Sequence, residues 1–174
     1  MIWYYQIKVY IRDKRSPVPK SEAVSRVMSA NCGKNTNPEL AIRKALWKQN
    51  IRGYRLHVKK LPGKPDIVFS GLKLAIFVHG CFWHRCPSCN YSLPKTNVEY
   101  WKTKFCRNVE RDKRHLEMLK ASNWDVLVVW ECEIKRSPDE VVKKIVNAVQ
   151  FARKNLSRPL SSSVRNGDDF VCSC

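Results

Sequence analysis

The sequence predicts an α/β sandwich in which helices flank a central mixed β-sheet. Short apolar runs typical of buried strands alternate with longer amphipathic segments typical of helices. Their order along the chain is helix, three strands, helix, strand, helix, which is characteristic of a sheet covered by helices. With 174 residues, of which 44% are hydrophobic, the chain is large enough for one domain with a hydrophobic core.

The first helix of this domain is predicted to begin at Asn37. Asn37 can cap the helix, Pro38 suits its first position, and Glu39 places an acid in the first turn. The amphipathic segment LAIRKALWKQN continues the helix, which should end before Gly53.

Three strands are predicted next. YRLHV (54–58) alternates apolar and polar residues, and DIVF (66–69) follows the turn LPGKP. After a second turn, SGLK, the run LAIFV (74–78) is apolar throughout, as in a strand buried on both faces.

The second half of the domain is predicted to be helix, strand, helix. A long helix over residues 98–121 carries apolar residues along one side and ends before Asn123. DVLVVW (125–130) is expected to be another fully buried strand, and SPDE caps an amphipathic helix over residues 139–155.

These elements suggest three regions. Residues 1–36 form a basic arm with two prolines, loosely ordered except for a short helix over residues 21–29. Residues 37–155 form the folded domain, and the Ser-rich segment 156–174 is expected to be a flexible tail.

The charge of the chain indicates a polyanionic partner. Lysine and arginine exceed aspartate and glutamate by 33 to 15, a formal charge of +18, which favours nucleic acid over a ribosome-like basic protein or an anionic membrane surface. The longest apolar run, 126–130, is too short to span a bilayer. The N-terminus does not have the order of a secretory signal, so we expect a cytoplasmic protein whose eight cysteines are thiols rather than disulfides.

A cluster of cysteines predicts a metal site. Cys81, Cys86 and Cys89 offer three soft ligands on one loop, and structural zinc requires four in a tetrahedron. The fourth should come from another element and tie the loop down. Cys132, just after the strand at 125–130, is well placed, and Cys106 in the long helix is the alternative.

Asp66 is a candidate ligand for a hard cation. An acid after a Pro-Gly-Lys-Pro turn is often only a turn residue. Asp66, however, opens one of two adjacent strands in a basic domain, where an aspartate could hold Mg²⁺ for phosphate chemistry. The next strand offers no acid or lysine to complete such a set, so other groups must supply charge and proton transfer.

Histidines and a helical carboxylate could supply them. His79 and His84 follow directly on the buried strand, where loops often carry function. Asn108 and Asp112 lie four residues apart, on one face of the long helix. A carboxylate that orients a histidine makes it a better general base, although a solvated salt-bridge face is the simpler explanation of this charged helix.

An aromatic pair lies inside the cysteine cluster. Phe82 and Trp83 could pack in the core, or could stack on nucleic-acid bases if they are exposed on a basic surface. Trp101, near the start of the long helix, could join them.

Together these segments resemble the very short patch repair endonucleases, a family that nicks DNA beside a T·G mismatch left by deamination of 5-methylcytosine. The resemblance covers about residues 13–135 and rests on KNTNPE with RKAL, LPGKPDIVF, FVHGCFWH, NVERD and VLVVWEC, in that order. It implies the fold of type II restriction endonucleases, which agrees with the predicted order of elements.

The resemblance also implies an Mg²⁺-dependent active site. Asp66 would bind the ion, and the backbone carbonyl of Val78 would be the second protein ligand. His84 would be the general base and Asp112 its partner, while His79 would help to hold water and phosphate at the metal.

Further residues match supporting positions of the family. Asn108 would support the site and Glu39 would lie near it, while Met28 of the arm would enter the DNA from the other groove. The structural zinc ligands would be Cys81, Cys86, Cys89 and Cys132, and the residues that push into the base stack would be Phe82, Trp83 and Trp101.

The chain departs from the family pattern in three places. Some members have Cys-x4-His-x-Cys where this chain has Cys-x4-Cys-x2-Cys, and some have a polar residue at the position of Val78. The segment MIWYYQIKVY at residues 1–10 has no recognised counterpart in the family.

The expected function is therefore strand nicking in T·G-mismatched double-stranded DNA by a monomer associated with the nucleoid. Mismatch-repair proteins are candidate partners, and a membrane is not expected. The alternatives are a relaxed-specificity nickase or restriction-type nuclease of the same fold, and a non-catalytic zinc module that binds DNA.

Overall fold

The computed structural model of the protein describes residues 17–19, 21–30 and 33–156. The chain divides into two compact units between Gly33 and Lys34. Residues 1–16 of the predicted arm and 157–174 of the predicted tail lie outside the described residues.

The first unit contains the short helix α1, Glu22–Ser29, as predicted. Its N-cap is Ser21, whose hydroxyl accepts a hydrogen bond from the Val24 amide at 3.3 Å. Met28 lies in the last turn of this helix.

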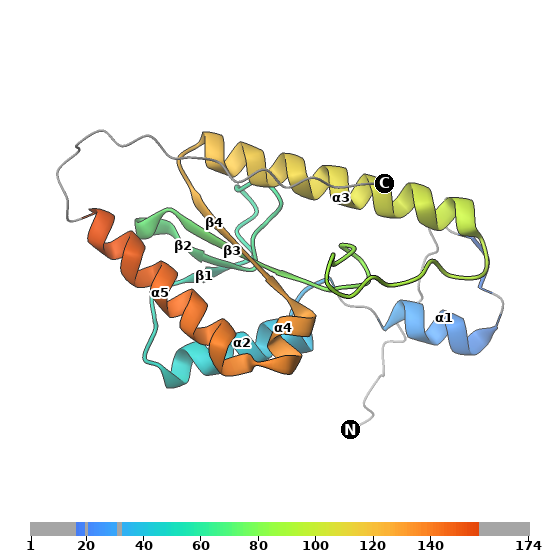
Figure 1. The fold of residues 1–174 in the computed structure, drawn as a ribbon, viewed down its shortest axis with the longest axis horizontal. Coiled ribbons are helices and arrows are strands. Elements are labelled where there is room, and N and C mark those ends of the chain that lie inside the picture. Colours follow the sequence, from blue (N-terminus) through green and yellow to red (C-terminus); the bar gives the residue numbers. More distant parts are fainter. Residues whose placement is uncertain (1–16, 20, 31–32, 157–174) are drawn as a thin grey trace, which may run out of the picture. The chain divides into compact units, whose positions relative to one another are not determined.

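The second unit is built on a four-stranded mixed sheet, which confirms the predicted architecture (Figure 1). The strands lie in the order β1-β2-β3-β4, with the first two pairings antiparallel and β3 parallel to β4. Their bounds are β1 Arg55–Leu56, β2 Ile67–Phe69, β3 Leu74–His79 and β4 Asp125–Trp130, and the 3₁₀ turn η1, Ser70–Leu72, joins β2 to β3.

Helices cover both faces of the sheet. The long helix α3 connects the parallel strands β3 and β4 and packs on one face, while α2, α4 and α5 cover the other (Figure 1). The bounds of these helices are α2 Asn37–Lys48, α3 Val98–Ala121, α4 Glu131–Arg136 and α5 Pro138–Leu156. None of the described helices is both long and apolar enough to cross a membrane.

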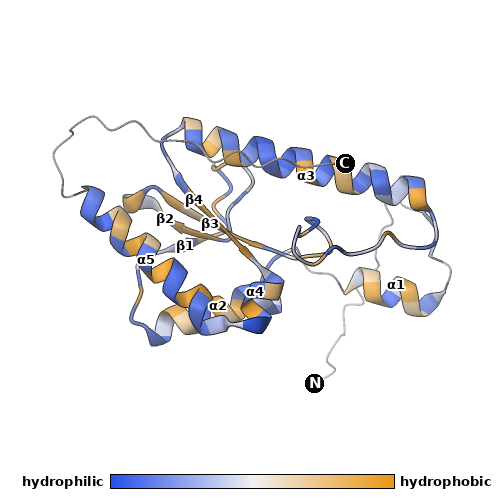
Figure 2. Ribbon diagram, viewed as in Figure 1, coloured by the Kyte–Doolittle hydropathy of each residue, from blue (hydrophilic) through white to orange (hydrophobic). Residues whose placement is uncertain are grey.

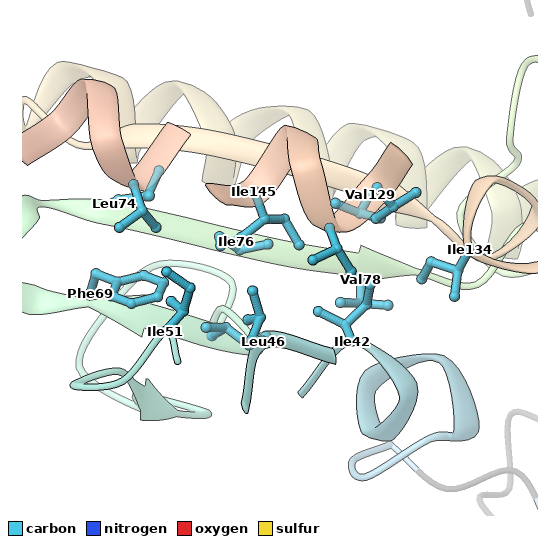
Figure 3. Close-up of a cluster of buried hydrophobic side chains, with 14 residues drawn as sticks. Ile42, Leu46, Ile51, Phe69, Leu74, Ile76, Val78, Val129, Ile134 and Ile145 are labelled. Carbon is cyan, nitrogen blue, oxygen red and sulfur yellow. The ribbon is translucent and has the colours of Figure 1, made fainter. Parts of the chain in front are cut away.

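The alternation of side chains along β3 divides the core into two clusters. Leu74, Ile76 and Val78 point to the α2 and α5 side, where they meet Leu46 and Ile145 (Figure 3). Ala75 and Phe77 point to the α3 side. The central strands are hydrophobic, whereas hydrophilic and hydrophobic residues alternate along the covering helices (Figure 2), as expected of helices that pack one side on a sheet.

Four details differ from the sequence-based expectation. Helix α2 is capped by Thr36, so Asn37 is its first residue and not its cap. Strand β1 ends at Leu56 because His57 takes a left-handed backbone conformation, with φ of 47°. The short helix α4 was not expected. Strand β4 is buried only at Val129, because it lies at the edge of the sheet.

Candidate active site

The end of strand β3 brings two histidines together. His79 is the last residue of the strand and lies on its α3 side, where it is 7% exposed. The loop that follows turns back so that the His84 ring stacks on the His79 ring, with centroids 4.0 Å apart and planes 8° from parallel. Trp130, at the paired end of β4, lies edge-on to His79 at 5.3 Å.

Helix α3 contributes a carboxylate to this pair. The Asp112 Oδ2 atom lies 2.5 Å from His84 Nδ1, and Arg111 donates a hydrogen bond to Asp112 Oδ1 at 3.1 Å. The sequence suggested either an orienting carboxylate or a solvated salt-bridge face, and the structure shows a half-buried carboxylate paired with histidine.

Burial, hydrogen bonding and nearby charges give His79 and Asp112 different protonation states. Burial, together with the nearby charges of His84 and Arg111, lowers the pKa of His79 to about 3, so this ring is neutral at physiological pH. Burial by itself would raise the pKa of Asp112, but its hydrogen bond to His84 and the neighbouring positive charges outweigh burial and lower it. Asp112 is therefore an anion beside His84.

Asp66 lies at the start of β2, directly against β3. Its Oδ2 accepts a hydrogen bond of 2.7 Å from the Val78 amide, and its own amide donates to the Ile76 carbonyl at 3.0 Å. Carbonyl groups two residues apart in a strand point toward the same neighbouring strand. The Val78 carbonyl therefore points, like that of Ile76, toward β2 and Asp66.

The environment of Asp66 opposes its negative charge. Burial raises the pKa of Asp66 to about 6, the Val78 amide partly counteracts this, and the charge of Glu39 adds to the rise. A carboxylate destabilised by burial and by a second carboxylate is a group whose charge a cation would offset.

Glu39 comes from the first turn of α2 and is 4% exposed. Its Oε1 accepts hydrogen bonds from the Thr36 amide and hydroxyl at 3.3 and 2.8 Å, and its Oε2 accepts one from the Asn35 amide at 2.9 Å. These bonds form a capping box, so Glu39 stabilises the start of α2 and also presents Oε2 toward the site.

His57 is a further residue of this group that the sequence analysis did not identify. Its ring lies between the two carboxylates, with Nε2 3.4 Å from Glu39 Oε2 and Nδ1 3.7 Å from Asp66 Oδ1. The antiparallel pairing of β1 with β2 puts His57 opposite Asp66. Placing these two strands side by side in antiparallel register could have revealed it from the sequence.

The remaining predicted polar residue, Asn108, positions the loop after β3. Its Nδ2 donates a hydrogen bond of 3.1 Å to the Trp83 carbonyl from the same face of α3 as Asp112. Asn108 thus ties to α3 the loop segment that carries His84.

The four predicted cysteine ligands converge. The Sγ atoms of Cys81, Cys86, Cys89 and Cys132 lie within 4.8 Å of one another, and those of Cys86 and Cys132 are 3.7 Å apart. Sulfur atoms about 2.3 Å from a tetrahedral zinc ion would be separated by about 3.8 Å. This cluster could therefore hold zinc, whereas the alternative Cys106 is exposed on α3.

Two hydrogen bonds join this cluster to the beginning of α4. The Cys132 amide donates to Cys81 Sγ at 3.3 Å, and the Cys81 amide donates to Glu131 Oε2 at 3.4 Å. Burial raises the pKa of Cys81. Burial would do the same to Cys132, but hydrogen bonds from the thiols of Cys89, Cys81 and Cys86 lower its pKa. These hydrogen bonds stabilise the thiolate form of Cys132.

The predicted aromatic residues form one cluster beside the cysteines. Phe82 packs edge-on against Trp83 and Trp101, at 5.1 and 6.0 Å between ring centroids. Phe82 and Trp83 are partly exposed, whereas Trp101 is buried, with 8% of its surface exposed. The Lys104 ammonium lies 5.4 Å from the Trp83 ring centroid.

Comparison with known proteins places this arrangement in a family. The model of the family described as DNA mismatch endonuclease Vsr matches residues 16–90. The type II nicking enzyme V.XorIIP of Xanthomonas oryzae is 44% identical over 122 residues, or 70% of this chain and 86% of the relative. The type II nicking enzyme V.NmeAIP of Neisseria meningitidis is 41% identical over 72% of this chain and 93% of the relative. The DNA mismatch endonuclease Vsr of Escherichia coli is 37% identical over 64% of this chain and 70% of the relative. The identity and coverage of these matches show that this protein belongs to the Vsr family of strand-nicking DNA endonucleases.

Proposed function

We propose that this protein nicks one strand of double-stranded DNA beside a T·G mismatch, in an Mg²⁺-dependent reaction that starts very short patch repair of deaminated 5-methylcytosine. One observation carries the proposal: adjacent residues of β3 contact both groups, since the Val78 amide donates to Asp66 Oδ2 and the His79 ring stacks on the ring of His84, which is paired with Asp112. A candidate general base and a candidate cation ligand thus share one site.

The residues around Asp66 fit a hard divalent cation. Asp66 Oδ2 is occupied by the Val78 amide, while Oδ1 faces the neighbouring Glu39–His57 pair, and oxygen ligands of this kind suit Mg²⁺. Asp66 and the Val78 carbonyl would hold the ion, with Glu39 near them. When bound, Mg²⁺ would polarise the scissile phosphate and stabilise the negative charge that develops on the leaving 3′ oxygen.

His84 and Asp112 would activate the attacking water. Asp112 accepts a hydrogen bond from the Nδ1–H group of His84, which leaves Nε2 as the nitrogen that can take a proton from water. Asp112 stays ionised because its pKa is lowered, so it also stabilises the positive charge that His84 then acquires. Attack opposite the 3′ oxygen would leave a 5′ phosphate and a 3′ hydroxyl.

His79 would have a supporting role as a neutral ring. It is stacked on His84, which restricts the rotation of that ring, and its lowered pKa keeps a second positive charge away from the base. We also propose that it helps to hold water and the phosphate by hydrogen bonding.

Zinc held by the four cysteines would fix the loop that carries these groups. The loop leaves β3 at Gly80 and is joined to α4 through Cys132, so the ion would connect two segments that are distant in sequence. We propose this role as structural and assign no chemistry to the zinc.

The aromatic residues of the same loop would read the mismatch. Phe82 and Trp83 are partly exposed and could enter the base stack. Unstacking a mismatched pair requires less free energy than unstacking a matched one. Trp101 is buried in this structure, so its insertion would require the aromatic cluster to open. Met28 is proposed to enter from the other groove, and residues 37–155 to form the catalytic domain.

A nicking assay tests this proposal. Duplexes that differ only in one T·G or C·G pair would be incubated with the zinc-loaded protein, with and without Mg²⁺, and the product ends identified. Nicking of the T·G duplex only, and only with Mg²⁺, is expected. Equal nicking of both duplexes would indicate a relaxed nickase, and binding without any nicking would indicate a non-catalytic DNA-binding module.

Asp66→Asn is the matched variant for this assay. It should bind the T·G duplex and fail to nick it, because it lacks the charge that would hold the cation. Full activity in Asp66→Asn would exclude the proposed metal role.

A further inference from the structure

The His57 ring is enclosed by the two carboxylates, yet one of its nitrogens has no hydrogen-bond partner. Nε2 is inaccessible to solvent and makes no hydrogen bond within the described residues, although Glu39 Oε2 is only 3.4 Å away. Buried polar atoms nearly always have a partner, so this nitrogen indicates an interaction that completes the site.

The backbone holds the ring in this place at a conformational cost. His57 has a φ of 47°, in the left-handed region that side chains seldom adopt, and its amide donates to the Asp66 carbonyl at 3.3 Å. This conformation ends β1 and turns the ring toward Glu39 and Asp66. Strained residues of this kind cluster at functional sites, where the surrounding structure imposes them.

The distances fit shared coordination better than a hydrogen-bonded bridge. N–H···O hydrogen bonds are about 2.7–3.2 Å long, whereas the two ring nitrogens lie 3.4 and 3.7 Å from their nearest carboxylate oxygens. Two ligand atoms about 2.1 Å from one cation, at an angle of 90–110°, are about 3.0–3.4 Å apart. The Nε2 and Oε2 atoms meet that condition, and one atom from each of Glu39, His57 and Asp66 lies within 4.8 Å of the others.

We propose that His57 contributes an imidazole nitrogen to the divalent-cation site of this protein, together with Glu39 and Asp66. The inference rests on the proposed metal role of Asp66 and extends it from an oxygen-only site to a mixed nitrogen and oxygen site. Imidazole binds first-row transition ions better than it binds Mg²⁺. The site should therefore accept Mn²⁺ more tightly than Mg²⁺, and His57 should be the source of part of that preference.

Electron paramagnetic resonance with Mn²⁺ tests the proposal on the DNA-free, zinc-loaded protein. Mn²⁺ is suitable because it is a hard ion and competes poorly with zinc for the four cysteines. Bound Mn²⁺ should show a ¹⁴N coupling in the wild-type protein, which His57→Asn should abolish. Asparagine tolerates the left-handed backbone well, so this variant should retain the fold. Loss of the ligand should also weaken Mn²⁺ binding about tenfold or more, and Mg²⁺ binding by less.

His115→Gln is the control, because it removes a histidine of α3 that belongs to neither histidine–carboxylate group. It should keep the ¹⁴N coupling. A coupling that survives in His57→Asn and in a second variant, His57→Gln, would overturn the inference while leaving the Asp66 cation site in place. Wild-type protein that binds neither Mn²⁺ nor Mg²⁺ would instead refute the cation site itself, and the inference with it.

Discussion

Replacing Asp66 with asparagine should make the cation-free protein more stable at neutral pH. The pKa of Asp66 is raised from 3.8 to about 6, chiefly by burial, with the Val78 amide partly opposing the rise and the charge of Glu39 adding to it. Asparagine removes the buried charge and keeps an oxygen that can accept the hydrogen bond from Val78. Its stabilising effect would identify Asp66 as a residue retained for function at the expense of stability.

The magnitude follows from the difference between the folded and unfolded pKa. Each tenfold change in an acid dissociation constant is worth 1.36 kcal/mol, so ionising Asp66 in the fold costs about 3 kcal/mol. The folded state binds the proton more tightly than the unfolded chain. The stability contributed by protonated Asp66 is therefore complete below pH 3.8 and is lost as the pH rises to about 6. Relative to a pH well below 3.8, the ionisation of Asp66 should lower the free energy of unfolding of the wild type by about 1.5 kcal/mol at pH 5 and by about 3 kcal/mol at pH 7.5.

Urea unfolding of wild type and Asp66→Asn between pH 5 and 7.5, in buffer freed of Mg²⁺ and with zinc retained, measures the effect. The advantage of Asp66→Asn should grow with pH and then level off. Asp112→Asn should behave in the opposite way. Its lowered pKa contributes stability above pH 3.8 that is lost on acidification, so this variant should be less stable than wild type at neutral pH. An Asp66→Asn protein that is no more stable than wild type at pH 7.5, or whose advantage does not change with pH, would refute the reasoning.

Three other predictions test the remaining parts of the site. Zinc content per folded chain, measured by mass spectrometry, should fall from one toward zero in Cys132→Ser and stay at one in Cys106→Ser; the reverse result would move the fourth ligand to α3. His84→Gln should slow single-turnover nicking by about 10²–10⁴-fold, because it removes the general base, with DNA affinity unchanged; a rate near that of wild type would exclude this role. Trp83→Ala should weaken binding to a T·G duplex by about 1–3 kcal/mol through lost stacking. An equal loss on a matched duplex in the same titration would show that Trp83 does not discriminate the mismatch.

The elements that the sequence predicted well are those with strong local patterns. The run LAIFV became the central strand β3, and the predicted helix over residues 98–121 is α3, because a continuous apolar run and a long amphipathic pattern permit few alternatives. The errors arose where tertiary contacts outweigh local preference. The alternating pattern of YRLHV predicted a strand through Val58, but packing of the His57 ring beside Asp66 ends the strand at Leu56.

The burial of β4 was overestimated for a related reason. DVLVVW has the composition of a central strand, yet it lies at the sheet edge, where only Val129 is fully enclosed. Whether a strand lies at the centre or at the edge depends on which other strands pair with it, and among the described strands β4 pairs only with β3. The composition of a single strand does not contain that information.

By itself the sequence determined which functional groups the protein contains. These are a cysteine loop with the spacing of a metal site, histidines at the end of a buried strand, and an excess of positive charge suited to DNA. Only the tertiary structure decided which of these groups meet. It brought Cys132 rather than Cys106 to the loop, paired Asp112 with His84, and enclosed His57 between Glu39 and Asp66. The reason is physical. Local patterns follow from the preferences of neighbouring residues, whereas a site built from a helix and two strands forms only when their apolar faces pack against one another.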